Sequence, residues 1–179
     1  KVMKNYRNTK QILEVAYHVL LENLVDDFVQ DDDLELLDPK FANRHSSAPW
    51  IYSANSLEEE FAYARQYINE YTKDNNSRCC IAIAGYTHFE MRQFASEVGL
   101  RLLEGHDTPI NDRLVLSDLE QTKGYEFDLM VILNCSKDIL PPADVDQDER
   151  YRYGCQLYVA MTRAKDELIL SFNGEKSDW

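Results

Sequence analysis

Three short polar clusters in this sequence combine a cationic side chain with aromatic or small residues. They are Asn5-Tyr6-Arg7-Asn8-Thr9, Thr122-Lys123-Gly124-Tyr125-Glu126-Phe127-Asp128 and Tyr158-Val159-Ala160-Met161-Thr162-Arg163-Ala164-Lys165. A guanidinium group binds phosphate oxygens in a bidentate manner, and an aromatic ring stacks on a nucleobase. The clusters therefore contain the residue types that bind phosphorylated nucleotides.

Each cluster taken alone has a plainer interpretation. A Tyr-Arg pair near a helix start is usually packing plus a surface charge, and Lys123-Gly124 is usually a turn. Cations in a sequence such as Thr162-Arg163-Ala164-Lys165 often lie at a helix end, where the negative end of the helix dipole favours them. The nucleotide interpretation therefore depends on the three clusters occurring together and in this order.

Helical and strand-like periodicities alternate along the chain, which predicts an α/β fold with a parallel sheet covered by helices on both faces. Helices are predicted after a cap at Asn8 or Thr9, after the capping boxes that begin at Ser56 and Thr87, and from about Glu149 to Arg163. Strands are predicted at residues 50–52, 79–84, 114–116, 129–133 and 168–170. Ligands of such sheets bind beyond the carboxyl ends of the strands, so we expect the polar clusters there.

The composition indicates one globular domain over residues 1–179. Apolar residues make up 44% of the sequence, which is enough for a real core, and no stretch approaches the roughly 20 apolar residues that span a membrane. The first residues contain no signal peptide and no initiator Met, so we expect a piece of a larger chain. Cys79 and Cys80 are adjacent, the other two cysteines stand alone, and the four histidines are scattered. This pattern predicts no disulfide framework, no metal site and a cytoplasmic location.

The negative charge is concentrated in one segment. The net charge is −13, and residues 11–39 contain nine acids without any Lys or Arg, so the rest of the chain carries about −4. The plain interpretation is a solvated helix end and loop. Alternatively, the acidic segment at about residues 26–38 docks a basic protein partner. Either way, the chain lacks the overall basic charge of a free-standing nucleic-acid-binding domain.

Together, the three clusters resemble motifs IV, V and VI of the UvrD/Rep-type superfamily 1 helicases. Asn5-Tyr6-Arg7 resembles motif IV, and Lys123-Gly124-Tyr125-Glu126-Phe127-Asp128 resembles motif V, whose usual form is Lys-Gly-Leu-Glu-Phe. Residues 157–165 match motif VI almost throughout. The resemblance extends from Asn5 to about Ser171 and implies the second, C-terminal, of two RecA-like motor domains.

The resemblance implies roles for matching residues in an ATP site. Tyr6 stacks on the adenine, Arg7 reaches the γ-phosphate, and Glu126 accepts a hydrogen bond from the ribose hydroxyl. Gly124 shapes the loop, and Arg163 acts as an arginine finger. A fixed guanidinium stabilises the charge that spreads over the transferring phosphoryl oxygens, which is consistent with this last role.

Some positions depart from the family pattern. Motif V usually begins Thr-x-His, and alignment on Lys123 puts Asp118 and Glu120 at these nucleic-acid-facing positions. The resemblance implies that Lys123 faces the nucleic acid as well. Two carboxylates near a phosphate backbone would repel it. The arginine that often follows the strand ending at Ala84 is replaced by Gly85-Tyr86.

The sequence contains no Gly-x-x-x-x-Gly-Lys-Ser/Thr loop to bind phosphates. In the family, this loop and the Mg²⁺ ligands belong to the N-terminal RecA-like domain. We therefore expect half of an ATP site in an ATP-dependent DNA helicase, with ATP and Mg²⁺ as cofactors. The implied partners are the N-terminal motor domain and single-stranded nucleic acid, with DNA as the expected track, and the chain alone is expected to be inactive. The alternatives are a catalytically inactive helicase-like module used for protein interaction, and a nucleotide-regulated regulator.

Overall fold

The structure is a computed structural model that describes residues 5–23, 42–44, 48–105 and 111–179. The acidic segment at about residues 26–38, and with it the expected docking of a basic partner, lies outside the described residues. The side chains of residues 5–7 lie outside them as well, which includes those of Tyr6 and Arg7.

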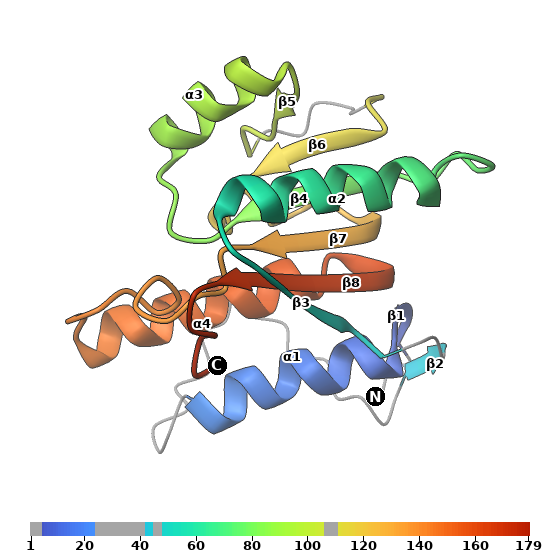
Figure 1. Ribbon diagram of the computed structural model, residues 1–179. Helices are drawn as coiled ribbons and strands as arrows, with labels where there is room; N and C mark the ends of the chain where they lie inside the picture. The colour runs from blue at the N-terminus through green and yellow to red at the C-terminus, as the bar shows by residue number, and fades with distance from the viewer. Residues whose placement is uncertain (1–4, 24–41, 45–47, 106–110) are drawn as a thin grey trace.

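The centre of the fold is a six-stranded sheet in which all strand pairs are parallel (Figure 1). Its order is β3-β8-β7-β4-β6-β5. The strands are β3 (Trp50–Ala54), β4 (Cys79–Ile83), β5 (Arg101–Leu102), β6 (Leu114–Ser117), β7 (Phe127–Leu133) and β8 (Ala164–Asn173). The predicted parallel sheet is confirmed, and its parallel strands put all of their amino ends at one edge and all of their carboxyl ends at the other.

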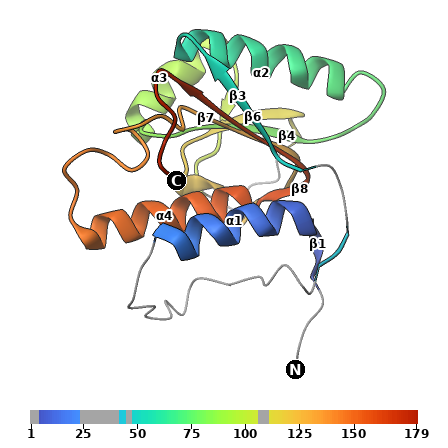
Figure 2. The ribbon, with the colours of Figure 1, turned by 60° about the horizontal axis from the view of Figure 1, so that its bottom comes forward.

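Helices cover both faces of the sheet (Figure 2). On one face lie α2 (Leu57–Tyr71) and α3 (His88–Val98), and on the other lie α1 (Lys10–Asn23) and α4 (Gln147–Met161). All five residues of β4 are buried and alternate between two apolar cores. Cys80 and Ala82 face the core under α1 and α4, whereas Cys79, Ile81 and Ile83 face the core under α2 and α3. This explains why the sequence of β4 is apolar throughout.

Helix caps fix where α1, α2 and α3 begin. The Thr9 hydroxyl accepts a bond from the backbone N–H of Ile12, so of the two predicted caps of α1, Thr9 has this role. The Ser56 hydroxyl accepts from Glu59 N at 3.2 Å. Thr87 and Glu90 form the full predicted capping box of α3, and Gly99 ends that helix with a positive φ of 68°.

The polar segment Asn5–Thr9 forms strand β1, which the sequence did not predict. It pairs in parallel with β2 (Ala42–Arg44) in a separate two-stranded sheet. Two further differences affect the site. The helix α4 ends at Met161, before Arg163, and β8 begins at Ala164, earlier than predicted. Arg163 therefore lies in the short connection between α4 and β8.

Candidate nucleotide and nucleic-acid sites

Arg163 lies at the amino ends of β7 and β8, because it directly precedes β8 and its carbonyl accepts a 2.9 Å bond from Phe127 N, the first residue of β7. The half-buried side chain folds back on the end of α4. Its Nε donates to the Val159 carbonyl at 3.2 Å, and Nη2 donates to the Thr162 hydroxyl at 3.4 Å. These bonds orient the guanidinium plane.

The loop with Gly124 and Glu126 reaches the same edge of the sheet. It runs from the 3₁₀ helix η2 (Glu120–Thr122) to Phe127. Gly124 has φ +88°, and a Cβ there would meet no atom within 4 Å, so backbone conformation rather than crowding favours glycine. Glu126 is half-buried and directly precedes the residue that is bonded to Arg163. The structure therefore brings the second and third clusters together.

Asn8 joins the first cluster to the third. Its side chain is buried, and its Nδ2 donates to the carbonyls of Thr162 and Ala164 at 2.7 and 2.6 Å. These two residues flank Arg163, so one amide group fixes the backbone on both sides of it. Tyr6 and Arg7 directly precede Asn8 in β1, which places their backbone near this connection.

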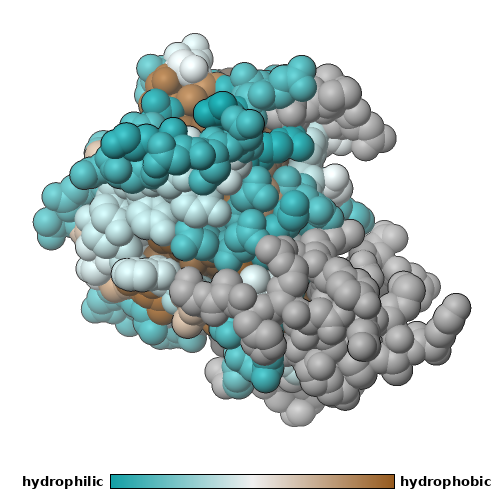
Figure 3. Space-filling view, turned by 90° about the vertical axis from the view of Figure 1, so that its right-hand side faces the viewer, coloured by the Kyte–Doolittle hydropathy of each residue, from teal (hydrophilic) through white to brown (hydrophobic). Residues whose placement is uncertain are grey.

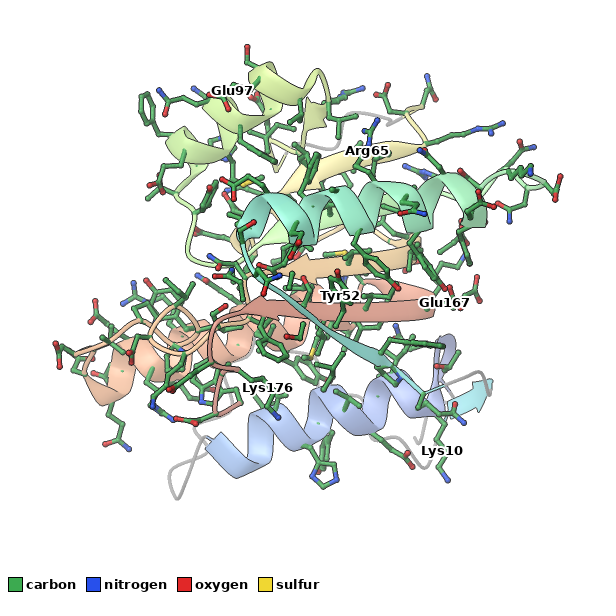
Figure 4. All side chains as sticks on the ribbon, viewed as in Figure 1. Lys10, Tyr52, Arg65, Glu97, Glu167 and Lys176 are labelled. Carbon is green, nitrogen blue, oxygen red and sulfur yellow. The ribbon has the colours of Figure 1, made fainter. Side chains whose placement is uncertain are left out.

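These clusters lie at the amino edge of the sheet, so the prediction that they lie at the carboxyl ends is wrong for Glu126 and Arg163. The reason is that each directly precedes a strand instead of following one. Figure 4 shows Glu167 and Lys10 on the same side of the molecule as β1. Glu167 lies near the start of β8, and Lys10 is the first residue of α1. Figure 3 faces this edge, and most of its described surface is hydrophilic.

Charges at the amino edge are partly paired with one another. Lys165 Nζ lies 3.7 Å from Asp128 Oδ1. Tyr67 donates to Glu167 Oε2 at 2.9 Å, and burial together with this bond raises the pKa of Tyr67 above its usual range. Burial, followed by the negative charge of Glu167, raises the pKa of Tyr71 to about 12. Both tyrosines are therefore neutral at physiological pH.

The carboxyl edge holds Asp118 and a cavity of about 340 Å³. The lining residues come from the carboxyl end of β4, the start of α3, the segment after β6, Pro142 and α4: Ile83, Gly85, Tyr86, Thr87, His88, Asp118, Leu119, Glu120, Pro142, Arg152, Tyr153 and Gln156. The lining combines aromatic rings with the cation of Arg152. An exposed aromatic residue, Phe89, follows His88 at the start of α3.

Asp118 is held inside this edge by two interactions. Its side chain is 8% exposed, Oδ1 accepts from Gln121 N at 2.8 Å, and Oδ2 lies 3.2 Å from His88 Nδ1. By contrast, Glu120 and Lys123 are exposed. Of the two carboxylates expected to repel a strand, Asp118 therefore has a structural role, since it accepts a bond from Gln121 N in η2 and pairs with His88.

Sequence reasoning missed His88 and Arg152 as members of this cavity. His88 was one of four scattered histidines, and its pairing with Asp118 joins residues that are 30 positions apart. The capping box at Thr87 and Glu90 could have indicated the position of His88. It follows a buried strand, so the helix that it begins starts at the carboxyl edge of the sheet.

Two features are absent from the described residues. No group of three or more His, Cys, Asp or Glu residues that could hold a metal ion is found among residues 5–23, 42–44, 48–105 and 111–179. In the same ranges, no helix is long and apolar enough to cross a membrane.

Comparisons with known proteins agree with the fold. The crystal structure of the C-terminal domain of a possible DNA helicase from Lactobacillus plantarum WCFS1 is similar, with a TM-score of 0.64 and 18% sequence identity. The similarity covers 97% of this chain and 91% of that one. It supports the predicted RecA-like α/β fold, which is confirmed. A search of curated proteins gave no match.

A family model also matches the sequence. The UvrD-like helicase C-terminal domain matches residues 82–175, which include the second and third clusters, Gly124, Glu126 and Arg163. The matched region is more than half of the chain, and the fold agrees with that of the C-terminal domain of the possible DNA helicase from Lactobacillus plantarum. The chain therefore belongs to the UvrD-like helicase C-terminal domain family.

Proposed function

We propose that this chain is the second motor domain of an ATP-dependent superfamily 1 DNA helicase or translocase. The observation that carries the proposal is the convergence of Asn8, Glu126 and Arg163 at one edge of the sheet. In this proposal, Arg163 and Arg7 stabilise the phosphoryl oxygens of ATP, Glu126 binds the ribose and Tyr6 stacks on the adenine.

The residues at the amino edge fit one side of a nucleotide site. A guanidinium that stabilises charge on transferring phosphoryl oxygens must be fixed before the reaction, and Arg163 is fixed through two side-chain bonds and its carbonyl. We propose that the phosphate-binding loop and the ligands of Mg²⁺ come from an N-terminal RecA-like domain. ATP then supplies the free energy of movement, and closure of the two domains delivers Arg163 to it.

We further propose that single-stranded DNA lies across the carboxyl edge, at the cavity between α3 and α4. Aromatic side chains there offer stacking surfaces for bases, and Arg152 offers a cation for a phosphate. Because Asp118 interacts with Gln121 and His88, its charge is directed into the protein rather than across the path. The exposed carboxylate of Glu120 opposes phosphate binding in this cavity.

The first test is ATP turnover by this chain with and without a second motor domain. We expect no measurable hydrolysis by the chain alone, with or without single-stranded DNA, because the phosphate-binding loop is not in its sequence. A protein that contains both motor domains should hydrolyse ATP, and DNA should stimulate it. Robust turnover by the chain alone would contradict a shared site. Binding of a protein partner without turnover in the two-domain protein would favour the interaction module.

The second test changes the cation in the cavity. In the two-domain protein, Arg152→Ala should weaken single-stranded DNA binding and reduce the slope of log affinity against log salt by about 1, the change for one lost phosphate contact. Fluorescence titrations at several salt concentrations measure both quantities. Arg92→Ala is the matched control, because Arg92 is an exposed arginine of α3 that does not line the cavity. Equal effects of the two variants would indicate a general charge effect and no phosphate at Arg152.

A further inference from the structure

The carboxylate of Glu60 is buried in the first turn of α2, although its neighbours Glu58 and Glu59 are exposed. Its exposed fraction is 0%. Burying a carboxylate is costly unless other groups satisfy its oxygens. Within the described part of the chain, no Lys or Arg forms an ion pair with Glu60. Hydrogen-bond donors must therefore stabilise it.

Four hydrogen bonds from three residues converge on or around this carboxylate at the carboxyl ends of β7 and β8. Oε1 accepts from Asn134 N at 2.9 Å and from the Ser171 hydroxyl at 2.5 Å. Oε2 accepts from Asn173 Nδ2 at 2.6 Å, and the same Nδ2 lies 3.2 Å from Asn134 Oδ1. Asn134 directly follows β7, and Asn173 is the last residue of β8. Glu60 thus joins the ends of two strands to α2.

Asn134 extends this network to the wall of the cavity. It has a positive φ of 65°, and its Nδ2 donates to the Ala84 carbonyl at 2.9 Å. Ala84 directly precedes Gly85 and Tyr86, which line the cavity. Gly85 has φ +79°, and a Cβ there would lie 2.6 Å from Cγ2 of Ile139. The turn at Gly85 is therefore fixed from two sides: the Ile139 side chain packs against Gly85, and Asn134, which belongs to the network around Glu60, bonds to the Ala84 carbonyl.

We propose that Glu60 is a positioning residue for the nucleic-acid cavity. Its carboxylate, acting through Asn134, fixes the Gly85-Tyr86 turn in the arrangement that contacts the strand, while Glu60 itself does not line the cavity. An apolar side chain could fill the same volume, but it would leave the Asn134 N–H and the Asn173 amide without this acceptor. The proposal rests on the proposed function, because it assigns the ligand of the cavity.

The test compares Glu60→Gln with Ile68→Ala, which removes a buried apolar side chain from the same helix away from the cavity. Glutamine keeps the shape but presents an N–H group to hydrogen-bond donors. In the two-domain protein, Glu60→Gln should raise the DNA concentration for half-maximal ATPase stimulation about tenfold, the equivalent of one lost bond to a charged group. Turnover at saturating DNA should change much less. Ile68→Ala should lower the melting temperature without raising the DNA concentration for half-maximal ATPase stimulation.

Asn134→Gly is the second variant, in case Glu60→Gln does not fold. Glycine accepts the positive φ and keeps the backbone N–H that donates to Glu60, but it removes the bond to the Ala84 carbonyl. The same rise in half-maximal DNA concentration is expected. Amide hydrogen exchange of residues 84–88 in this chain alone should also accelerate in both variants, and not in Ile68→Ala.

These readouts separate failure of this proposal from failure of the proposed function. If the two-domain protein responds to DNA, and both variants change only the melting temperature, Glu60 has a structural role alone and the proposal is overturned. If DNA never stimulates ATP turnover in the unsubstituted protein, the proposed function fails. Exchange at residues 84–88 then still decides whether Glu60 and Asn134 hold the turn: unchanged exchange would overturn that claim too.

Discussion

Replacing Arg163 with alanine in the two-domain enzyme is expected to lower kcat for ATP by on the order of 10³-fold, the typical contribution of an arginine finger. The fold and the affinity for ATP should stay almost unchanged, because the two side-chain bonds of Arg163, to the Val159 carbonyl and the Thr162 hydroxyl, are local to the end of α4. Arg163→Lys keeps the charge but loses the planar fork that spans two phosphate oxygens, so it should recover only a small part of the turnover.

A plain helix-end cation at position 163 predicts a different outcome. Such a charge contributes about 0.3–1 kcal/mol to stability and nothing to catalysis. Both variants would then have slightly lower melting temperatures and hydrolyse ATP at the wild-type rate. Steady-state ATPase and melting temperature, measured on the same three proteins, distinguish the two roles. Wild-type turnover in Arg163→Ala would end the motor interpretation.

The second large effect is expected at Asn8, which holds the backbone on both sides of Arg163. Asn8→Asp has the same shape, but a carboxylate cannot donate to the carbonyls of Thr162 and Ala164. Unpaired buried polar groups cost about 1–3 kcal/mol each, so the free energy of unfolding should fall clearly. Turnover in the two-domain enzyme should fall about 10²-fold, since misplacement of a reacting group by about 1 Å has this effect.

Ile12→Val is the control for Asn8. Ile12 is fully buried in α1 and belongs to the apolar core between the sheet and the helices α1 and α4. The substitution removes one methylene group and leaves the hydrogen bonds of Asn8 to Thr162 and Ala164 in place. It should cost about 0.5–1.5 kcal/mol of stability. Urea unfolding and ATPase rates of both variants give the comparison. If turnover follows stability equally in both, Asn8 has no specific role at Arg163.

The sequence predicted those parts of the fold that depend on local pattern. The buried strands β4 and β7 are continuous apolar runs, and α3 begins and ends with a capping box and a glycine. The strand β1 was missed because its residues are polar, and its position depends on Asn8, whose partners are about 154 residues away along the chain. No local pattern contains that information.

Two site residues show the same limit. Asp118 was predicted to face the nucleic acid from its place in the motif, and its bonds to Gln121 and His88 depend on how the carboxyl edge packs. Glu60 stands in a run of three glutamates that is typical of a solvated first helical turn. Its burial follows from the ends of β7 and β8, which only the folded sheet brings to it. The roles of Tyr6, Arg7, Gly124, Glu126 and Arg163 remain predictions.

The helix α4 has a mechanical consequence for the two edges of the sheet. It carries Arg152 at the cavity and ends just before Arg163, so one rigid rod of about 14 Å separates Arg152 from Met161. A helix resists stretching, whereas residues 118–126, which also run from the carboxyl edge to the amino edge, include a glycine with positive φ. In the proposed function, a strand that moves Arg152 along the helix axis is therefore expected to move the Arg163 connection as well. In that proposal, the stiffness of α4 determines how far Arg163 moves for a given displacement of the strand.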